Sequence, residues 1–276
     1  MAAAADAAVL VGVSSERTFP AVRVAAREAA LHQRPLLLLH AFDWDSAFEA
    51  PSVVGPRAQA EELVSRAAAV ANECEPALPV GAEIVEGSAV TTLVRRSVSA
   101  FLVAVGDSGM AGHDHRVFAD APAVQIAARA DCPVLVARHE PPPLGPVLVG
   151  VDGSHLSRLA LRWAFDCASR RRSRLLAVRV VERGETDEQA TDRLARIVAD
   201  CAGRHQDVAV ECHAIHGEPG HVLVDQSRSA QVAVVAARGD EPRRGMLGAV
   251  AQSLLYHSPA PVMVVRGLVN GAQQPG

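Results

Sequence analysis

The fold is decided by the stretch Val147-Leu148-Val149-Gly150-Val151-Asp152-Gly153-Ser154. Its first five residues form an apolar run typical of a buried β-strand, and the last three have the composition of a turn that caps a helix. Apolar residues then recur at helical spacing from Leu156 to Ala164. A buried strand that turns sharply into a helix is the first unit of an α/β domain. Such a turn offers backbone N–H groups to an anionic ligand.

An earlier copy of the strand, Val9-Leu10-Val11-Gly12-Val13, shows that the chain contains a repeat. Each copy is followed by the same alternation of helical and strand patterns. In the first half we expect helices at 21–31, 59–71, 90–99 and 121–130 and strands at 36–42, 82–85, 101–105 and 133–136. In the second half we expect helices at 159–169, 188–202, 220–229 and 249–256 and strands at 175–181, 208–215, 232–235 and 261–265. The sequence therefore predicts an α/β protein with two tandem, doubly wound, parallel five-stranded sheets.

The two halves meet at 139–146, where three consecutive prolines exclude a helix and stiffen the chain. We therefore expect one domain at 1–138, a Pro-rich linker at 139–146 and a second domain at 147–267. The fifth strand of each half is short, apolar and at the edge of its sheet. We predict that 134–136 and 262–265 pair antiparallel within one chain, and association of two whole chains stays open.

Composition excludes several classes of protein. The chain has 27 basic and 31 acidic residues with no long block of one sign, so neither nucleic-acid nor membrane binding is expected. All of its Lys and Arg positions are arginine, which excludes a P-loop lysine and a Schiff-base lysine. Five cysteines lack metal-ligand spacing, and His113 and His115 lack a third fixed ligand, so no metal site is predicted. With no positively charged segment at its start, the chain is expected to be cytoplasmic.

The expected ligand site lies where the winding of the sheet reverses, at the carboxyl ends of the first and fourth strands. In the second half, these positions are Asp152-Gly153 and the loop 236–249; in the first half, the fourth-strand loop is 106–120. Glycines in these loops let backbone approach a ligand, and the helix that follows points its N-terminus at the loop.

Both halves resemble the universal stress protein family, and the whole chain resembles a tandem member. The resemblance is carried by Val-Gly-Val-Asp-Gly-Ser at 149–154, by Ala-Leu-Arg-Trp-Ala at 160–164, and by the fifth-strand runs 132–136 and 260–265. It implies the strand order 3-2-1-4-5. In nucleotide-binding members it also implies ATP held by G-x-x-G, nine residues, then G-S/T, with the first-strand aspartate and the end of the second strand around the adenosine.

The two halves depart from that pattern unequally. The first has Gly106 and Gly109 but Ala119-Asp120 in place of Gly-Ser/Thr, and Ser14 in place of the aspartate. The second keeps the aspartate and the later glycines, with Ala236 for the first glycine and Ala249 for the hydroxyl residue. A carboxylate at Asp120 repels phosphate, so the resemblance favours ATP or another adenine nucleotide in the second half. The implied contacts there are Asp152, Gly153, Val180, Gly239, Gly248 and Ala249.

We therefore expect a non-enzymatic, cytoplasmic stress-response protein whose nucleotide occupancy regulates an unknown protein partner. The alternative is a nucleotide-free scaffold that uses only the paired-domain surface. An enzyme of the adenylate-forming class ranks third, because the chain has neither a Ser-Gly-Gly-x-Asp-Ser loop nor a lysine for phosphate chemistry.

Overall fold

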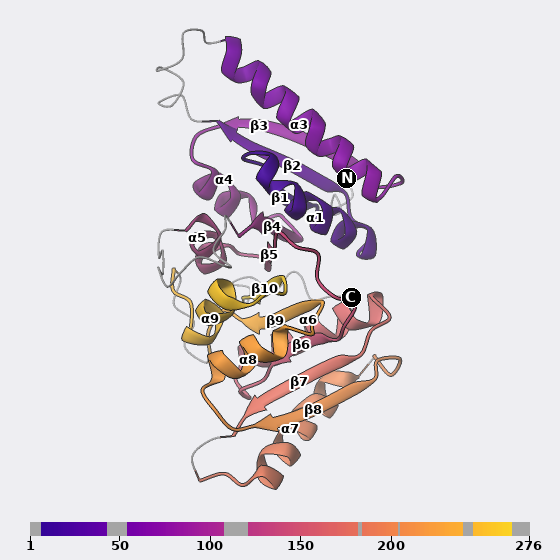
Figure 1. Ribbon diagram of the computed structural model, residues 1–276, viewed down its shortest axis with the longest axis vertical. Helices are drawn as coiled ribbons and strands as arrows, with labels where there is room; N and C mark the ends of the chain where they lie inside the picture. Colours follow the sequence, from indigo (N-terminus) through magenta and orange to yellow (C-terminus); the bar gives the residue numbers. More distant parts are fainter. Residues whose placement is uncertain are drawn as a thin grey trace, which may run out of the picture.

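The computed structural model describes residues 7–42, 54–107, 121–181, 184–203, 205–239 and 245–266. Within these ranges the strands join into one ten-stranded sheet, ordered β3-β2-β1-β4-β5-β10-β9-β6-β7-β8. Figure 1 shows the halves stacked along the long axis of the molecule, with β3 toward one end and β8 toward the other. Each half has the order 3-2-1-4-5 that the family resemblance implies.

The elements follow the expected alternation in both halves. The first half contains β1 (Val9–Gly12), η1 (Glu16–Thr18), α1 (Phe19–Leu31), β2 (Leu36–Phe42), α3 (Val54–Cys74), β3 (Val80–Glu86), α4 (Ala89–Arg96), β4 (Leu102–Gly106), α5 (Pro122–Arg129) and β5 (Val134–Ala137). The second contains β6 (Val147–Gly150), α6 (His155–Arg170), β7 (Leu175–Val180), α7 (Asp187–Ala202), β8 (Val210–Ile215), α8 (Pro219–Ser227), β9 (Val232–Ala236), α9 (Ala249–His257) and β10 (Val262–Val265).

The two halves are joined through their fifth strands. β5 and β10 pair antiparallel, with Val136 opposite Val262 and Val134 opposite Val264. All the other strand pairs are parallel. The prediction of an intrachain pair through the fifth strands is confirmed, and it turns two five-stranded units into one continuous sheet.

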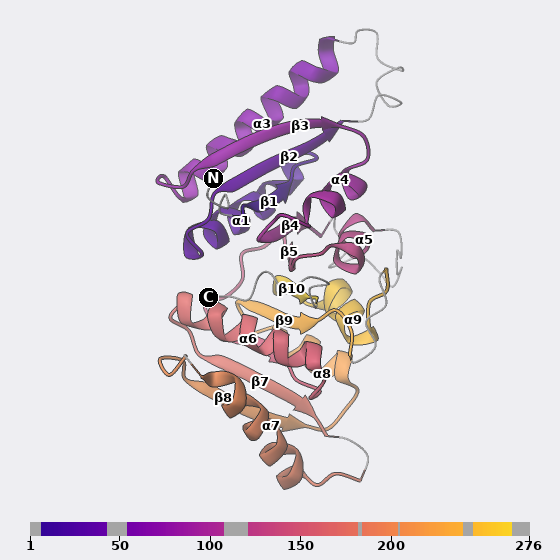
Figure 2. The same cartoon turned by 180° about the vertical axis from the view of Figure 1, so that it is seen from behind.

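Helices cover both faces of the sheet, as expected of parallel strands that are apolar on both sides. Buried side chains of α1, α3, α6 and α7 pack in one apolar cluster, and those of α4, α5, α8 and α9 pack in another. Trp163 of α6 is 3% exposed and belongs to the first cluster. Figure 2 shows α6 and α7 from the side opposite to Figure 1.

Two helices begin clearly earlier than expected: α6, which begins at His155 instead of 159, and α3. α3 begins at Val54, before Pro56, whereas the sequence pattern predicts a start at 59. A proline in the first turn of a helix loses no hydrogen bond, because the first N–H groups have no partner within the helix. Pro56 therefore lies inside the helix instead of preceding it.

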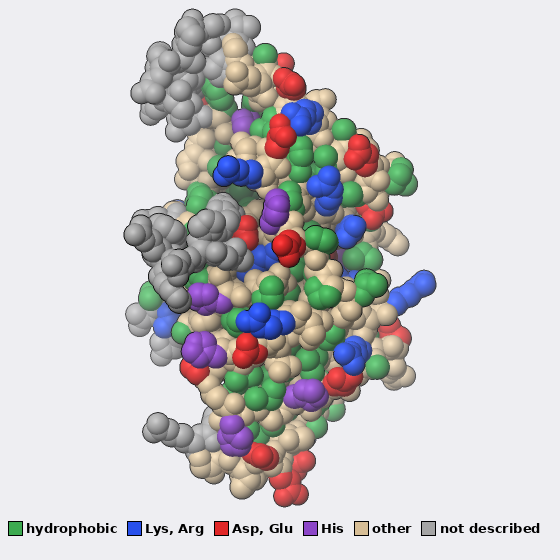
Figure 3. Space-filling view, in the orientation of Figure 1, with side chains coloured by type: hydrophobic (Ala, Val, Ile, Leu, Met, Phe, Trp, Pro, Cys, Tyr) green, Lys and Arg blue, Asp and Glu red, His purple; other side chains and the backbone are tan. Residues whose placement is uncertain are grey.

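The outer surface carries charges of both signs. Figure 3 shows arginine and acidic side chains interspersed over the face that it displays, without a continuous basic surface. Within the described ranges, no helix is long and apolar enough to cross a membrane.

Candidate functional site

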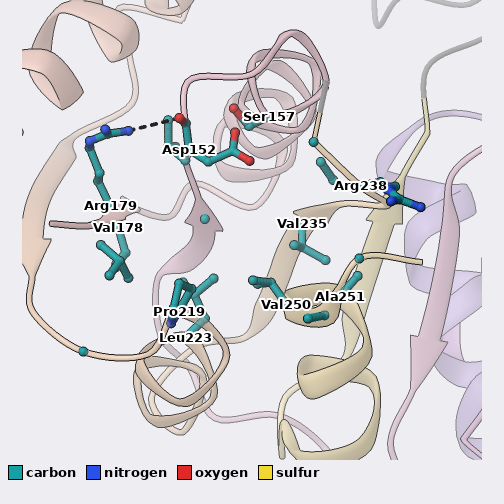
Figure 4. Close-up of a pocket in the computed structure, with 18 of the residues that line it drawn as sticks. Asp152, Ser157, Val178, Arg179, Pro219, Leu223, Val235, Arg238, Val250 and Ala251 are labelled. Carbon is teal, nitrogen blue, oxygen red and sulfur yellow. Dashed lines mark hydrogen bonds between the residues drawn. The ribbon is translucent and has the colours of Figure 1, made fainter. Parts of the chain in front are cut away.

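A cavity of ≈ 500 Å³, here called the second-half cavity, opens at the carboxyl ends of β6, β7 and β9, beside the start of α9 (Figure 4). Small-molecule pockets have volumes of roughly 300–1,000 Å³. β7 and β9 lie on opposite sides of β6, so the winding of the sheet reverses at this point. The apolar walls are formed by Val151, Val178, Pro219, Leu223, Val235 and Val250.

Most of the residues predicted for the nucleotide site lie around this cavity. Five of them line it: Asp152, Val180, Gly239, Gly248 and Ala249. The sixth, Gly153, instead lines an adjoining polar hollow of ≈ 760 Å³, which shares Asp152 and Gly239 with the cavity. The structure therefore brings together residues from three strand ends and one helix start.

The exposed side chain of Asp152 is ionised at neutral pH. Loss of water around the carboxylate raises its pKa. Hydrogen bonds from Ser154 and Ser157 outweigh that effect and hold the pKa below its ordinary value of 3.8. The backbone N–H of Ser154 donates to Oδ1 of Asp152 at 2.8 Å. A Cβ atom on Gly239 would lie 3.6 Å from Oδ2, so this glycine faces the carboxylate. Asp152 can accept hydrogen bonds from ligand hydroxyl groups.

The turn between β6 and α6 corrects one expectation, because the N–H groups of Gly153, Ser154 and Ser157 are bonded to side chains of the turn and are not left for an anion. Ser154 caps α6, and its hydroxyl accepts from the backbone N–H of Ser157 at 3.1 Å. The N–H of Gly153, which has φ +88°, donates to the hydroxyl of Ser157 at 3.1 Å. Side chains of the turn therefore satisfy the groups that the sequence pattern assigned to a ligand.

The start of α9 is better suited to an anion. Its N-cap residue is Gly248, so no side chain occupies the first N–H groups, and Ala249, Val250 and Ala251 line the cavity. The N–H of Gly248 donates to the carbonyl of Ala237 at 2.8 Å, which fixes the approach of the loop to the helix. Helix N-termini attract anions through free N–H groups and the helix dipole.

Arg179 is a lining residue that sequence reasoning missed. It is 2% exposed, its Nη1 donates to the carbonyl of Asp152 at 3.1 Å, and its Nη2 lies 3.5 Å from Oε2 of Glu185. At the matching position in the first half, His40 Nδ1 lies 2.7 Å from the carbonyl of Val13. In each half a polar side chain from the second strand thus holds the end of the first strand. The available signal was a single arginine inside an otherwise apolar strand.

Arg238 lies across the cavity from Arg179 in Figure 4. Its Nη1 is 3.8 Å from the sulfur of Met246, within the same loop. Arg243 and Arg244, two further arginines of this loop, lie outside the described residues.

The first-half site is described only in part. Gly106 ends β4, and Ser14 is exposed at the position that matches Asp152. Gly109 and Asp120 lie outside the described residues, as do His113 and His115. Among the residues that are described, no group of three His, Cys, Asp or Glu side chains is placed to hold a metal ion.

Sequence comparison relates both halves to one family. The sequence model of the universal stress protein family matches residues 7–138 and 144–266. A universal stress protein from Mycolicibacterium smegmatis is 33% identical over 289 residues, covering 95% of this chain and 98% of the relative. One from Mycobacterium tuberculosis is 33% identical over 285 residues, covering 94% and 96%.

Solved structures agree on the fold. A universal stress protein from Archaeoglobus fulgidus matches with a TM-score of 0.71 at 17% identity, covering 94% of this chain and 97% of that chain. A putative universal stress protein from Pseudomonas aeruginosa matches with a TM-score of 0.65 at 17% identity, covering 95% and 94%. With two family matches along one sequence, the chain belongs to the universal stress protein family, as a tandem member.

Proposed function

We propose that the second-half cavity binds an adenine nucleotide, ATP in the first instance. The adenosine lies between Asp152 and Val180, where the ionised carboxylate accepts hydrogen bonds from the ribose. The phosphates lie at the start of α9, against the N–H groups that follow Gly248. The observation that carries the proposal is that a single cavity gathers Asp152, Val180, Gly239, Gly248 and Ala249.

We further propose that occupancy of the cavity regulates a protein partner in the cytoplasm, without enzymatic turnover. The loop between Gly239 and Gly248 contacts the other half, because the N–H of Gly245 donates to the carbonyl of Ala128 at 3.0 Å. A ligand at the second-half cavity would therefore lie close to a contact between the two halves. All five cysteines are free thiols, which supports a reducing compartment.

Calorimetric titration of ATP into the full chain tests the nucleotide site. Asp152→Ala should weaken binding by about 10-fold or more, because a hydrogen bond to a charged group contributes roughly 1.5–3 kcal/mol. Ser14→Ala, at the matching first-half position, is the control and should change little.

A nucleotide-free scaffold is the second candidate, and the observation that favours it is Ala249, which offers no hydroxyl to a phosphate at the start of α9. If neither the wild-type chain nor Ala249→Ser produces binding heat at millimolar ATP, the nucleotide proposal fails and the scaffold replaces it.

A further inference from the structure

A second cavity, of ≈ 330 Å³, lies at the seam between the halves and is here called the seam cavity. Its walls come from the C-terminal parts of α1 and α6, from the linker residue Pro142, and from Val232 and Pro261 at the amino ends of β9 and β10. The second-half cavity opens at the carboxyl ends of the parallel strands. The seam cavity is therefore a separate site, at the opposite ends of the second-half strands.

Arginine dominates the charge around the seam cavity. Four arginines line it, namely Arg27, Arg170, Arg171 and Arg172, and Glu28 is the acidic residue among the lining residues. Apolar side chains such as Leu31, Leu135 and Val232 complete the wall. Charges beside an apolar wall are screened less than charges in open water, and this applies to the half-buried Arg170 and Arg171, which add positive potential to the cavity.

Two of the four arginines are already used to join the halves. Arg170 of α6 contacts both carboxylate oxygens of Asp166 at 2.9 Å and donates through Nη1 to the carbonyl of Leu31, at the end of α1, at 3.0 Å. Arg171 donates to Oε1 of Glu28. Arg170 is therefore paired with Asp166, and Arg171 with Glu28.

The other two arginines have no acidic partner within the described ranges. Within the described ranges, neither Arg27 nor Arg172 forms an ion pair, and both are exposed. Arg172 has φ +50°, a conformation that the matching first-half residue Gln33 shares at φ +53°. The backbone geometry at this position therefore does not require arginine.

The acidic residue of the cavity is buried and already paired with Arg171, so it does not present a free charge at the cavity mouth. Glu28 is 2% exposed, and its Oε2 has no hydrogen-bond partner among the described residues. Burial raises the pKa of this carboxyl, against the opposing effect of Arg171.

We propose that the seam cavity binds a compact polyanion, a small molecule with clustered phosphate or carboxylate groups, held by Arg27 and Arg172 across the junction of the two halves. Such a ligand joins α1 of the first half to α6 of the second. It would strengthen the association of the halves without entering the second-half cavity.

Calorimetry at low ionic strength with inorganic pyrophosphate and with citrate tests the site in the full chain, and the two arms distinguish phosphate from carboxylate chemistry. The double variant Arg27→Gln/Arg172→Gln should weaken binding of the preferred anion at least ~10-fold, the loss expected when charged contacts are removed. Arg23→Gln/Arg162→Gln removes the same charge from exposed positions of the same two helices outside the cavity and should leave affinity unchanged.

Ala249→Asp separates this site from the proposed nucleotide site, because it places a carboxylate at the start of α9. It should abolish ATP binding and leave pyrophosphate or citrate binding intact, whereas the seam double variant should leave ATP binding intact. The proposal is overturned if neither anion produces saturable heat, if the seam and control variants weaken binding equally, or if Ala249→Asp removes the anion binding.

Discussion

Arg138 and Arg266 stand at matching positions after β5 and β10, and each reaches across the seam to the C-terminal end of the other half's last helix. Arg138 Nη2 donates to the carbonyls of Leu254 and Leu255 in α9, both at 2.9 Å. Arg266 Nη1 donates to the carbonyls of Ala127, at 3.3 Å, and Ala128 in α5. Cations at helix C-termini are favourable because they complement the dipole and satisfy free carbonyls.

The contacts that Arg138 and Arg266 make with these helix ends should contribute unequally to stability. Arg138 is 4% exposed and also lies 3.5 Å from Oδ2 of Asp107, whereas Arg266 is only partly buried. Removing one partner of a buried charged contact costs roughly 3–5 kcal/mol. Arg138→Met should therefore lower the free energy of unfolding by about that amount, and Arg266→Met by clearly less, in urea unfolding experiments. Equal losses in the two variants would contradict this difference.

Ala249→Ser should tighten ATP binding, because a hydroxyl at the start of α9 adds a hydrogen bond to a charged phosphate. The expected gain is up to roughly 1.5–3 kcal/mol, or about 10–150-fold in the dissociation constant measured by calorimetry. Ala249→Asp changes the same position in the opposite direction and should weaken binding. An unchanged affinity in both variants would mean that the phosphates lie elsewhere.

Stability between pH 4 and 6.5 should depend on His32. Burial lowers the pKa of His32 from 6.5 to about 4, with Asp166 opposing the shift and nearby arginines adding to it. In this range the unfolded chain binds a proton that the folded chain excludes, so this contribution is full above pH 6.5 and is lost as the pH falls toward 4. The loss is at most about 3 kcal/mol.

His32→Phe should make the decline shallower while keeping the ring contacts with Phe101 and Trp163, whose centroids lie 4.7 and 6.2 Å from that of His32. The neighbouring Glu28 acts with the opposite sign. Its raised pKa stabilises the fold at low pH, and this contribution is lost as the pH rises through the folded value. Comparing the variant with the wild type, by urea unfolding at each pH, isolates the histidine. If the free energy of unfolding fell with pH equally in His32→Phe and in the wild type, His32 would not be the source of the decline.

Gly145→Ala should destabilise the chain far more than its place in the Pro-rich linker suggests. A Cβ atom at Gly145 would lie 1.9 Å from the carbonyl oxygen of Ser229, so backbone must move. The carbonyl of Gly145 also accepts from Ser173 Oγ at 2.9 Å and from Gln231 Nε2 at 2.6 Å. We expect a loss of about 1–3 kcal/mol in thermal or urea unfolding. Pro143→Ala, at an exposed position nearby, is the control and should cost little.

The fold could be read from the sequence because its signals are local and occur twice. The strand Val9–Gly12 and its copy Val147–Gly150 each lead into a helix, and the short apolar strands at Val134 and Val262 predict the edge pairing. The start of α3 was misplaced because a proline pattern does not distinguish a loop from the first turn of a helix.

The site was harder to predict, because its details depend on partners distant in sequence. Asp152 and Gly248 belong to motifs with fixed spacing, so their positions followed from the pattern. Arg179 did not, because its role depends on a carbonyl at Asp152 and a carboxylate at Glu185 that meet only in the folded chain. The satisfied N–H groups of Gly153 and Ser157 were missed for a different reason: their partners, Ser157 and Ser154, are close in sequence, but the sequence does not fix the direction of a serine hydroxyl.

The antiparallel junction of β5 and β10 has an evolutionary consequence, since it places two pseudo-equivalent halves in one polypeptide. In a symmetric dimer of identical subunits, every substitution occurs at both sites at once. Here the position after the first strand is Ser14 in one half and Asp152 in the other, so either site can change while its counterpart is preserved. The two halves can therefore diverge at their sheet ends while each still contributes to the seam, the first through Arg138 and the second through Arg266.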